Sequence, residues 1–178
     1  NGNSSTTAIT TATGELIFAN GTGAGRYEIT VAATSVQVPV AIWVSGSNNS
    51  TIAFKNSGST ALVPVWNNNT TAILGDVEIN STSTVLYRPF GTVTGSAFTM
   101  RNLTVMGTGT GGVQFFGGTN TSSLTLSGNY TQNADVVTLA YANANITFNV
   151  AGNFSVASGA TFKSTGGTGT VNFNGTAP

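Results

Sequence analysis

The chain contains neither cysteine nor histidine, and only ten of its 178 residues are charged. It therefore lacks the residues of Ser-His-Asp and Cys-His nucleophile systems and of the usual zinc sites. Five basic and five acidic residues balance to a formal net charge of zero. Such a chain offers no basic patch for nucleic acid and no basic amphipathic helix for a membrane surface. We therefore expect no catalytic residue, no metal site, no cofactor and no nucleic acid partner, and we do not expect an enzyme.

Long apolar runs are also missing, and none approaches the roughly 20 residues that span a bilayer. The chain begins at Asn1 without methionine, as expected where a signal peptide has been removed. A secreted domain of this size can fold without disulfides, so the absence of cysteine does not exclude export. These features predict an extracellular protein at the cell surface, with no membrane span in the mature chain.

Small polar residues dominate what is present. Glycine, serine, threonine and asparagine supply 91 of the 178 residues. Ten phenylalanines, four tyrosines and two tryptophans are nevertheless spread along the chain among valine, isoleucine and leucine. Disordered chains are poor in such residues, so we expect one domain with a buried core.

The apolar residues lie in short alternating runs that are separated by Gly, Asn, Ser and Thr clusters, and almost nothing has a helical period. The sequence therefore predicts an all-β protein. The expected strands are 15–19, 27–32, 35–44, 51–55, 60–65, 76–79, 84–87, 98–106, 112–116, 123–126, 134–141, 145–150, 153–156, 160–163 and 169–173.

Apolar pairs recur along the chain at uneven steps of roughly 21–26 residues. A parallel β-solenoid with coils of this length produces such a repeat, and so does a sandwich whose short strands follow one another at regular spacing. The uneven steps, and a first 45 residues that do not join the repeat, favour a β-sandwich or jelly-roll-like body over residues 15–178. The parallel β-solenoid is the alternative. The pairs are Ile52/Phe54, Val77/Ile79, Leu103/Val105, Leu124/Leu126, Ile146/Phe148 and Val171/Phe173.

Residues 1–14 form a separate segment with one large apolar residue, Ile9. One interpretation is a frayed tail. The other is an extended strand that completes the sheet of a neighbouring subunit by strand addition. In that second case Ile9, with the small neighbours Ala8 and Ala12, sets the register of the donated strand.

Thirteen of the twenty asparagines stand in Asn-x-Ser/Thr, the acceptor pattern for N-glycosylation, whereas composition alone gives about five. Strand alternation places the asparagine and the hydroxyl residue on the outer face and the residue between them in the core. We therefore predict N-glycans on this surface. The acceptors are Asn3, Asn20, Asn48, Asn49, Asn68, Asn69, Asn80, Asn102, Asn120, Asn129, Asn145, Asn153 and Asn174.

A few other residues suggest chemistry, and each also has a structural explanation. Asp76 and Glu78 share a strand face, either as paired carboxylates or calcium contacts or as a solvated face. Trp43 and Trp66 suit a carbohydrate platform or, more simply, core packing. The two lysines, Lys55 and Lys163, are candidates for an amide cross-link, although no pattern supports one.

Two resemblances follow from these features. The Thr/Ser/Ala-rich N-terminal segment, the Asn/Thr/Ser-rich β body and the density of acceptor sites together resemble archaeal surface filaments, the thread subunits of thermoacidophiles. That resemblance implies a glycosylated β-domain whose N-terminal strand, about Ser4–Thr13 here, inserts into the next subunit. Locally, 124–131 (LTLSGNYT) and 150–162 (VAGNFSVASGATF) are similar to the β-helix coils of bacterial adhesins.

The sequence thus predicts a structural subunit of a glycosylated extracellular filament. It would polymerise head-to-tail by donating its N-terminal strand, with copies of itself as partners. The alternative is a β-solenoid surface adhesin or passenger-type protein.

Overall fold

The structure is a computed structural model. It describes residues 16–18, 26–31, 37–38, 41–43, 51–56, 65–66, 71–82, 86, 89–90, 95, 97–107, 109–116, 118–119 and 121–175. Side chains are described from residue 51 onward, except in 56, 65–66 and 71–74.

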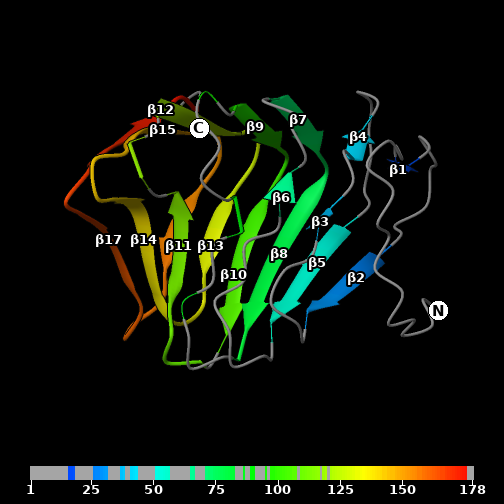
Figure 1. Cartoon of the computed structure of the whole chain (residues 1–178), viewed down its shortest axis with the longest axis horizontal. Helices are drawn as coiled ribbons and strands as arrows, with labels where there is room; N and C mark the ends of the chain where they lie inside the picture. Colours follow the sequence, from blue (N-terminus) through cyan, green and yellow to red (C-terminus); the bar gives the residue numbers. More distant parts are fainter. Residues whose placement is uncertain are drawn as a thin grey trace.

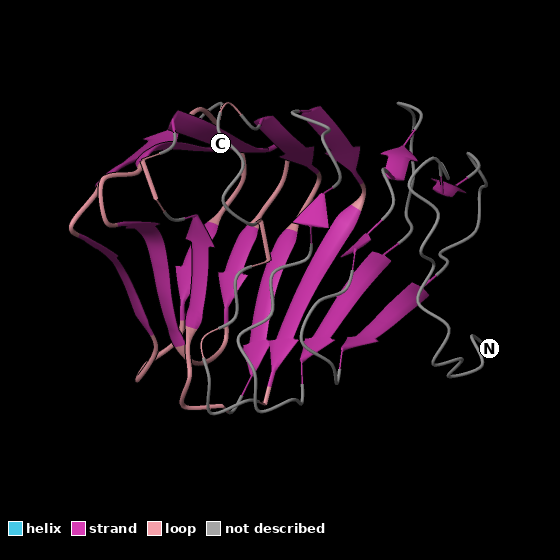
Figure 2. Ribbon diagram, viewed as in Figure 1, coloured by secondary structure: helices cyan, strands magenta, loops and turns pink. Residues whose placement is uncertain are grey.

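Parallel strands form three principal sheets that run side by side along the molecule (Figures 1 and 2). The largest has six strands, each paired in parallel with the next. In spatial order they are β16 (Phe154–Val156), β13 (Tyr130–Gln132), β10 (Leu103–Gly107), β8 (Asp76–Ser81), β5 (Thr51–Asn56) and β2 (Arg26–Val31).

A five-stranded and a three-stranded sheet form the other two sides, and both are parallel. The five-stranded sheet consists of β18 (Thr168–Phe173), β15 (Asn145–Val150), β12 (Thr121–Leu126), β9 (Ala97–Met100) and β7 (Thr71–Leu74). The three-stranded sheet consists of β11 (Val113–Phe116), β14 (Val136–Tyr141) and β17 (Thr161–Thr165).

Two further parallel pairs belong to the N-terminal part of the chain: β1 (Leu16–Phe18) with β4 (Ala41–Trp43), and β3 (Gln37–Val38) with β6 (Val65–Trp66). Their places in chain order match those of later strands, because β3 and β6 follow strands of the six-stranded sheet as β11, β14 and β17 do. The chain therefore winds as a three-sided β-solenoid. Most coils contribute one strand to each side, but in the coil that begins with β8 no strand is described between β8 and β9.

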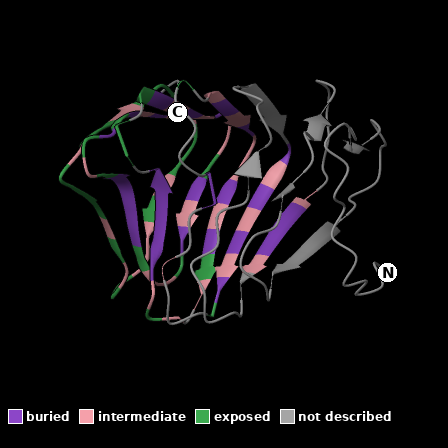
Figure 3. Cartoon of the chain, viewed as in Figure 1, coloured by how far each residue is buried: buried purple, intermediate pink, exposed green. Residues whose placement is uncertain are grey.

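Alternating side chains explain why these segments form strands. In β15, Ile146, Phe148 and Val150 are buried while Asn145, Thr147 and Asn149 face outward. β8 and β12 repeat this pattern, which appears as purple and lighter bands along β8 and β10 in Figure 3. Branched and aromatic residues suit such a pleated, half-buried surface, and each coil adds its inward residues to one continuous core.

Aromatic rings from all three sides meet in that core. Phe115 of β11, Tyr130 of β13 and Phe148 of β15 are fully buried. Their ring centroids lie 6.4 Å (Phe115–Tyr130), 6.3 Å (Phe115–Phe148) and 5.4 Å (Tyr130–Phe148) apart, with the rings nearly perpendicular. Edge-to-face packing of this kind stabilises aromatic pairs beyond simple burial. The three sheets are thus joined through their side chains rather than through backbone hydrogen bonds.

The preferred sequence prediction, a sandwich or jelly-roll body, is wrong, and its solenoid alternative is correct. Sandwich sheets are antiparallel, whereas every pairing between the described strands is parallel. The single antiparallel contact among the described residues is an isolated bridge between Tyr141 and Gly166. The N-terminal part of the chain does join the repeat, because β2 pairs with β5 along its whole length and β1 pairs with β4. Residues 1–14, the predicted N-terminal segment, lie outside the described residues.

Candidate functional site

The outer surface of the five-stranded sheet carries rows of short polar and small side chains, and we name the two rows that cross four strands the polar face. Four strands, β9, β12, β15 and β18, pair there without a register shift. Strands in such a sheet lie about 4.8 Å apart, so each row repeats at that spacing. One row consists of Ala97, Ser123, Thr147 and Thr170, and the other of Thr99, Thr125, Asn149 and Asn172.

The polar face is uncharged and partly locked by its own hydrogen bonds. The four strands contain no charged residue. Asn172 Nδ2 donates to Asn149 Oδ1 at 2.9 Å, and Asn149 Nδ2 donates to Thr125 Oγ1 at 3.2 Å. Threonine is stiff at χ1 because it is branched at Cβ. The face therefore presents hydroxyl and amide groups in a regular array that loses little entropy on contact.

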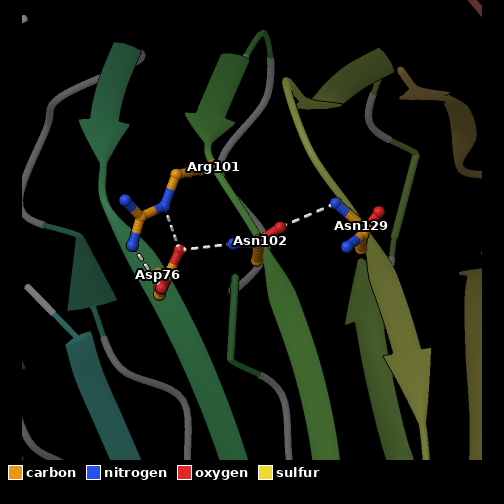
Figure 4. A network of polar contacts seen from close by, with 4 residues as sticks. All are labelled: Asp76, Arg101, Asn102 and Asn129. Atoms are coloured by element: carbon orange, nitrogen blue, oxygen red, sulfur yellow. Dashed lines mark hydrogen bonds and ion pairs between the residues drawn. The ribbon is translucent and has the colours of Figure 1, made fainter. Parts of the chain in front are cut away.

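A ladder of hydrogen-bonded side chains, which we name the corner ladder, lies at the corner where the chain passes from the five-stranded into the six-stranded sheet (Figure 4). Arg101 Nε and Nη2 donate to the two carboxylate oxygens of Asp76 at 2.6 and 2.5 Å. Asn102 Nδ2 donates to Asp76 Oδ1 at 2.8 Å, and Asn102 Oδ1 accepts from the backbone N–H of Asn129 at 2.7 Å. Asn129 Oδ1 in turn accepts from the N–H of Asn153 at 2.8 Å.

The corner ladder supplies the hydrogen-bond partners of the Asp76 carboxylate. The bidentate hydrogen bond to Asp76 raises the pKa of the Arg101 guanidinium, as expected for a charge-assisted pair. The carboxylate of Asp76 is thus occupied by Arg101 and Asn102 rather than paired with Glu78. Among the described residues, no group of three His, Cys, Asp or Glu side chains could hold a metal ion.

Glycine precedes asparagine in this corner for a steric reason. A Cβ on Gly128 would lie well under 3.0 Å from Asn102 Oδ1, and one on Gly152 would lie equally close to Asn129 Oδ1. Real Cβ atoms do not approach other atoms so closely. The Gly-Asn-aromatic sequences at 128–130 and 152–154 therefore reflect stacking of one coil on the next.

The last described coil, formed by β16, β17 and β18, leaves apolar surface uncovered. Phe173 is 65% exposed, and Phe154, Val156, Phe162 and Val171 are only partly buried against the core. Figure 3 shows the exposed class concentrated in this part of the chain. The outer edges of these strands have no hydrogen-bonded neighbour among the described strands, and such edges are templates for further strands.

Six of the predicted glycosylation acceptors lie in the part of the chain that the structure describes. Asn129, Asn145, Asn153 and Asn174 are exposed, while Asn80 and Asn102 are partly buried. Three of the six, Asn102, Asn129 and Asn153, are successive members of the corner ladder. The others lie outside the described residues: Asn3, Asn20, Asn48, Asn49, Asn68, Asn69 and Asn120.

The remaining predicted residues are scattered. Ala8, Ile9 and Ala12 lie outside the described residues, so the structure leaves the donor strand untested. Trp43 and Trp66 are placed by their backbones alone, in β4 and β6. Lys55 and Lys163 belong to β5 in the six-stranded sheet and β17 in the three-stranded sheet, on different sides of the solenoid.

Comparison with known proteins gives no relative: no family model, curated protein or solved structure matches the chain. Across its described residues, the structure contains no helix of the length and hydrophobicity needed to cross a membrane.

Proposed function

We propose that this chain is part of an extracellular surface adhesin whose solenoid is a rigid carrier for the polar face. The observation behind the proposal is the in-register, uncharged array of Thr, Ser and Asn side chains on β9, β12, β15 and β18. Each such group makes a weak contact, but a rigid row makes many contacts at once, and their avidity exceeds any single affinity. A neutral polysaccharide surface has the matching chemistry, because it is uncharged and rich in hydroxyl groups.

N-glycans are compatible with this function. Asn145 begins β15 and Asn174 follows β18, so each lies at a margin of the polar face rather than in its two rows. Both are exposed. Glycans at these positions would border the contact surface and would add solubility to a chain with few charges.

Paired substitutions test the polar face. Thr147 and Thr170 are register neighbours on it, and Thr104 and Thr131 are register neighbours on the outer side of the six-stranded sheet. Thr104, Thr131 and Thr147 complete predicted glycosylation sites, so the variants are compared in protein produced without glycans. We expect T147K/T170K to lose binding to neutral polysaccharide-coated beads at least tenfold, because long charged side chains break the rows. T104K/T131K is the matched control and should bind like the unmodified chain. Equal binding by both variants would contradict the proposal.

Head-to-tail assembly into a filament is the second candidate, and the uncovered final coil favours it. A second copy whose strands run in the same direction would extend all three sheets and cover Phe173. Such a contact is head-to-tail and propagates as an open fibre. Donation of the N-terminal strand, with Ile9 as its anchor, is one route to that assembly.

Electron microscopy of the full chain and three variants separates the two candidates. Filament formation predicts fibres from the full chain, and fewer fibres from a chain carrying Ile9→Asp or lacking residues 1–13 if the N-terminal strand is donated. Fibres that persist without residues 1–13 but disappear with Phe173→Asp would assign assembly to coil stacking instead. If the full chain stays monomeric at high concentration, the filament proposal fails and the adhesin proposal stands.

A further inference from the structure

An unexplained group of oxygen atoms lies at a different corner, where the six-stranded sheet ends and the three-stranded sheet begins. Ser81 ends β8, Gly107 ends β10 directly over it, and Asp135 lies between β13 and β14. Ser81 is 1% exposed and its Oγ has no hydrogen-bond partner. Asp135 Oδ2 is also buried without a partner. These two are the buried side-chain atoms of the described residues that lack a partner.

Gly107 brings the oxygens together. A Cβ on this glycine would lie far too close to both Asp135 Oδ2 and the carbonyl oxygen of Ser81. The two oxygens are therefore near neighbours in the space that the missing side chain leaves. The side chain of Ser81 faces inward beneath them, like those of Val77 and Ile79 in the same strand.

The backbone holds the Asp135 carboxylate in this place. Asp135 has a left-handed φ of 67°, a conformation that few residues other than glycine, asparagine and aspartate adopt. Its carbonyl accepts from Gln132 Nε2 and from the N–H of Thr161, both at 3.0 Å. Gln132 is itself buried and accepts from Tyr130 Oη at 3.0 Å. The polar groups that hold the Asp135 backbone are thus satisfied, whereas Asp135 Oδ2 and Ser81 Oγ are not.

Burying a carboxylate oxygen without a partner is costly, and burial raises the pKa of Asp135. The neighbouring atoms at this corner are acceptors, namely the Asp135 carboxylate oxygen and the Ser81 carbonyl oxygen. The carbonyl oxygen accepts from the N–H of Gly109 at 3.1 Å and keeps its second lone pair. Carboxylate, carbonyl and hydroxyl oxygens are the ligand set of hard cations, and Ca²⁺ accepts irregular geometries and completes its coordination with water.

We propose that Asp135 Oδ2, Ser81 Oγ and the Ser81 carbonyl oxygen form a binding site for a hard, oxygen-preferring cation of the calcium class. The ion joins three successive coils of the solenoid, because its ligands come from the ends of β8 and β13 on either side of Gly107. The site therefore stabilises the stack of coils rather than performing chemistry.

Cation-dependent stability of the full chain tests the proposal. Protein freed of metal by a chelator is melted with CaCl₂, MgCl₂, NaCl or KCl at constant ionic strength, and bound calcium is counted by equilibrium dialysis. We expect a saturable rise in Tm with CaCl₂ and one calcium per chain. A rise with NaCl alone would support the same oxygen site and assign it to a monovalent ion.

Variants locate the effect. Asp135→Asn keeps the shape but removes the charge, and it should weaken calcium binding at least tenfold. Ser81→Ala should weaken it less. Glu78→Gln removes one charge from the outer side of β8 and should leave the calcium affinity unchanged. If no cation binds the unmodified chain, or if all variants respond equally, the proposal is wrong. If Asp135→Asn does not fold, the stoichiometry of the unmodified chain and the Ser81→Ala affinity decide the outcome.

Discussion

Replacing Phe148 by alanine tests whether the three sheets share one aromatic core. Phe148 is fully buried, and its ring centroid lies between 5.4 and 6.4 Å from those of Phe115, Tyr130, Phe154 and Phe162. Removing a buried phenylalanine costs about 3–5 kcal/mol. We expect a loss at the upper end of that range, because ring partners from both of the other sheets lose contact with Phe148 together. The free energy of unfolding of natural domains is roughly 5–15 kcal/mol in total, so Phe148→Ala would remove a large share of it.

The assay is denaturant unfolding followed by circular dichroism, with Phe173→Ala as a matched control. Phe173 is the same residue type on the adjacent strand of the sheet, but it is 65% exposed. Its replacement should cost less than about 1 kcal/mol in the monomer. Similar losses for the two variants, or a loss below about 1.5 kcal/mol for Phe148→Ala, would refute the shared core.

Three further predictions follow from particular contacts. Gly152→Ala should destabilise by about 1–3 kcal/mol in the same assay, because its Cβ would strike Asn129 Oδ1 and the backbone of Gly128; an unchanged midpoint would contradict the stacking of the corner ladder. Chain isolated from its natural source should exceed 17.9 kDa by the mass of several glycans, with Asn145 among the modified residues; a naked mass would rule glycosylation out. Burial raises the pKa of Tyr130, so the folded state retains a proton that the unfolded state loses near its usual pKa of about 10. The contribution of Tyr130 to the free energy of unfolding should therefore be fully present below that pH and should fall as the pH rises above it. Tyr130→Phe should reduce the slope of the unfolding free energy against pH, measured by denaturation between about pH 9 and 11.

The sequence predicts the strands well because the alternation of buried and exposed residues is a local property. The strand predicted at 145–150 has the bounds of β15, and its inward residues are the expected ones. The segment 98–106 is predicted as one strand, but the structure divides it into β9 and β10. Arg101 and Asn102 form the corner there, and their contact with Asp76, 25 and 26 residues earlier, is not visible in a local pattern.

The sequence did not distinguish a sandwich from a solenoid, because buried and exposed side chains alternate with a period of two in parallel and antiparallel strands alike. The short step from Leu103 to Leu124, which counts against a solenoid, is not a coil length, because it connects β10 with β12 on two different sides of the coil. Within one sheet the register places Val77 opposite Leu103 and Leu103 opposite Tyr130. The sequence separation from Val77 to Leu103 and that from Leu103 to Tyr130 are nearly equal, and both are longer than the step from Leu103 to Leu124. Corner turns of different length absorb the remaining difference without loss of register.

The oxygen group at Ser81, Gly107 and Asp135 has no sequence signature. Its members belong to different coils and are far apart in the sequence, so only the stacking of coils brings them together. The Gly-Asn-aromatic repeat, in contrast, is present in the sequence as a likeness to adhesin coils. Its meaning as a ladder in which one asparagine caps the next depends on the hydrogen bonds from Asn129 and Asn153.

Cross-linking of engineered cysteines measures the parallel stacking of the coils most directly, because the chain has no cysteine of its own. Thr104, Thr131 and Ser155 are consecutive register partners on the outer side of β10, β13 and β16. Neighbouring strands lie about 4.8 Å apart, within the range that a disulfide bridges, whereas alternate strands lie about 9–10 Å apart, beyond it. In protein produced without glycans, the T104C/T131C and T131C/S155C pairs should oxidise readily, and T104C/S155C should not. Cross-linking of the T104C/S155C pair, or failure of both neighbouring pairs, would contradict the solenoid.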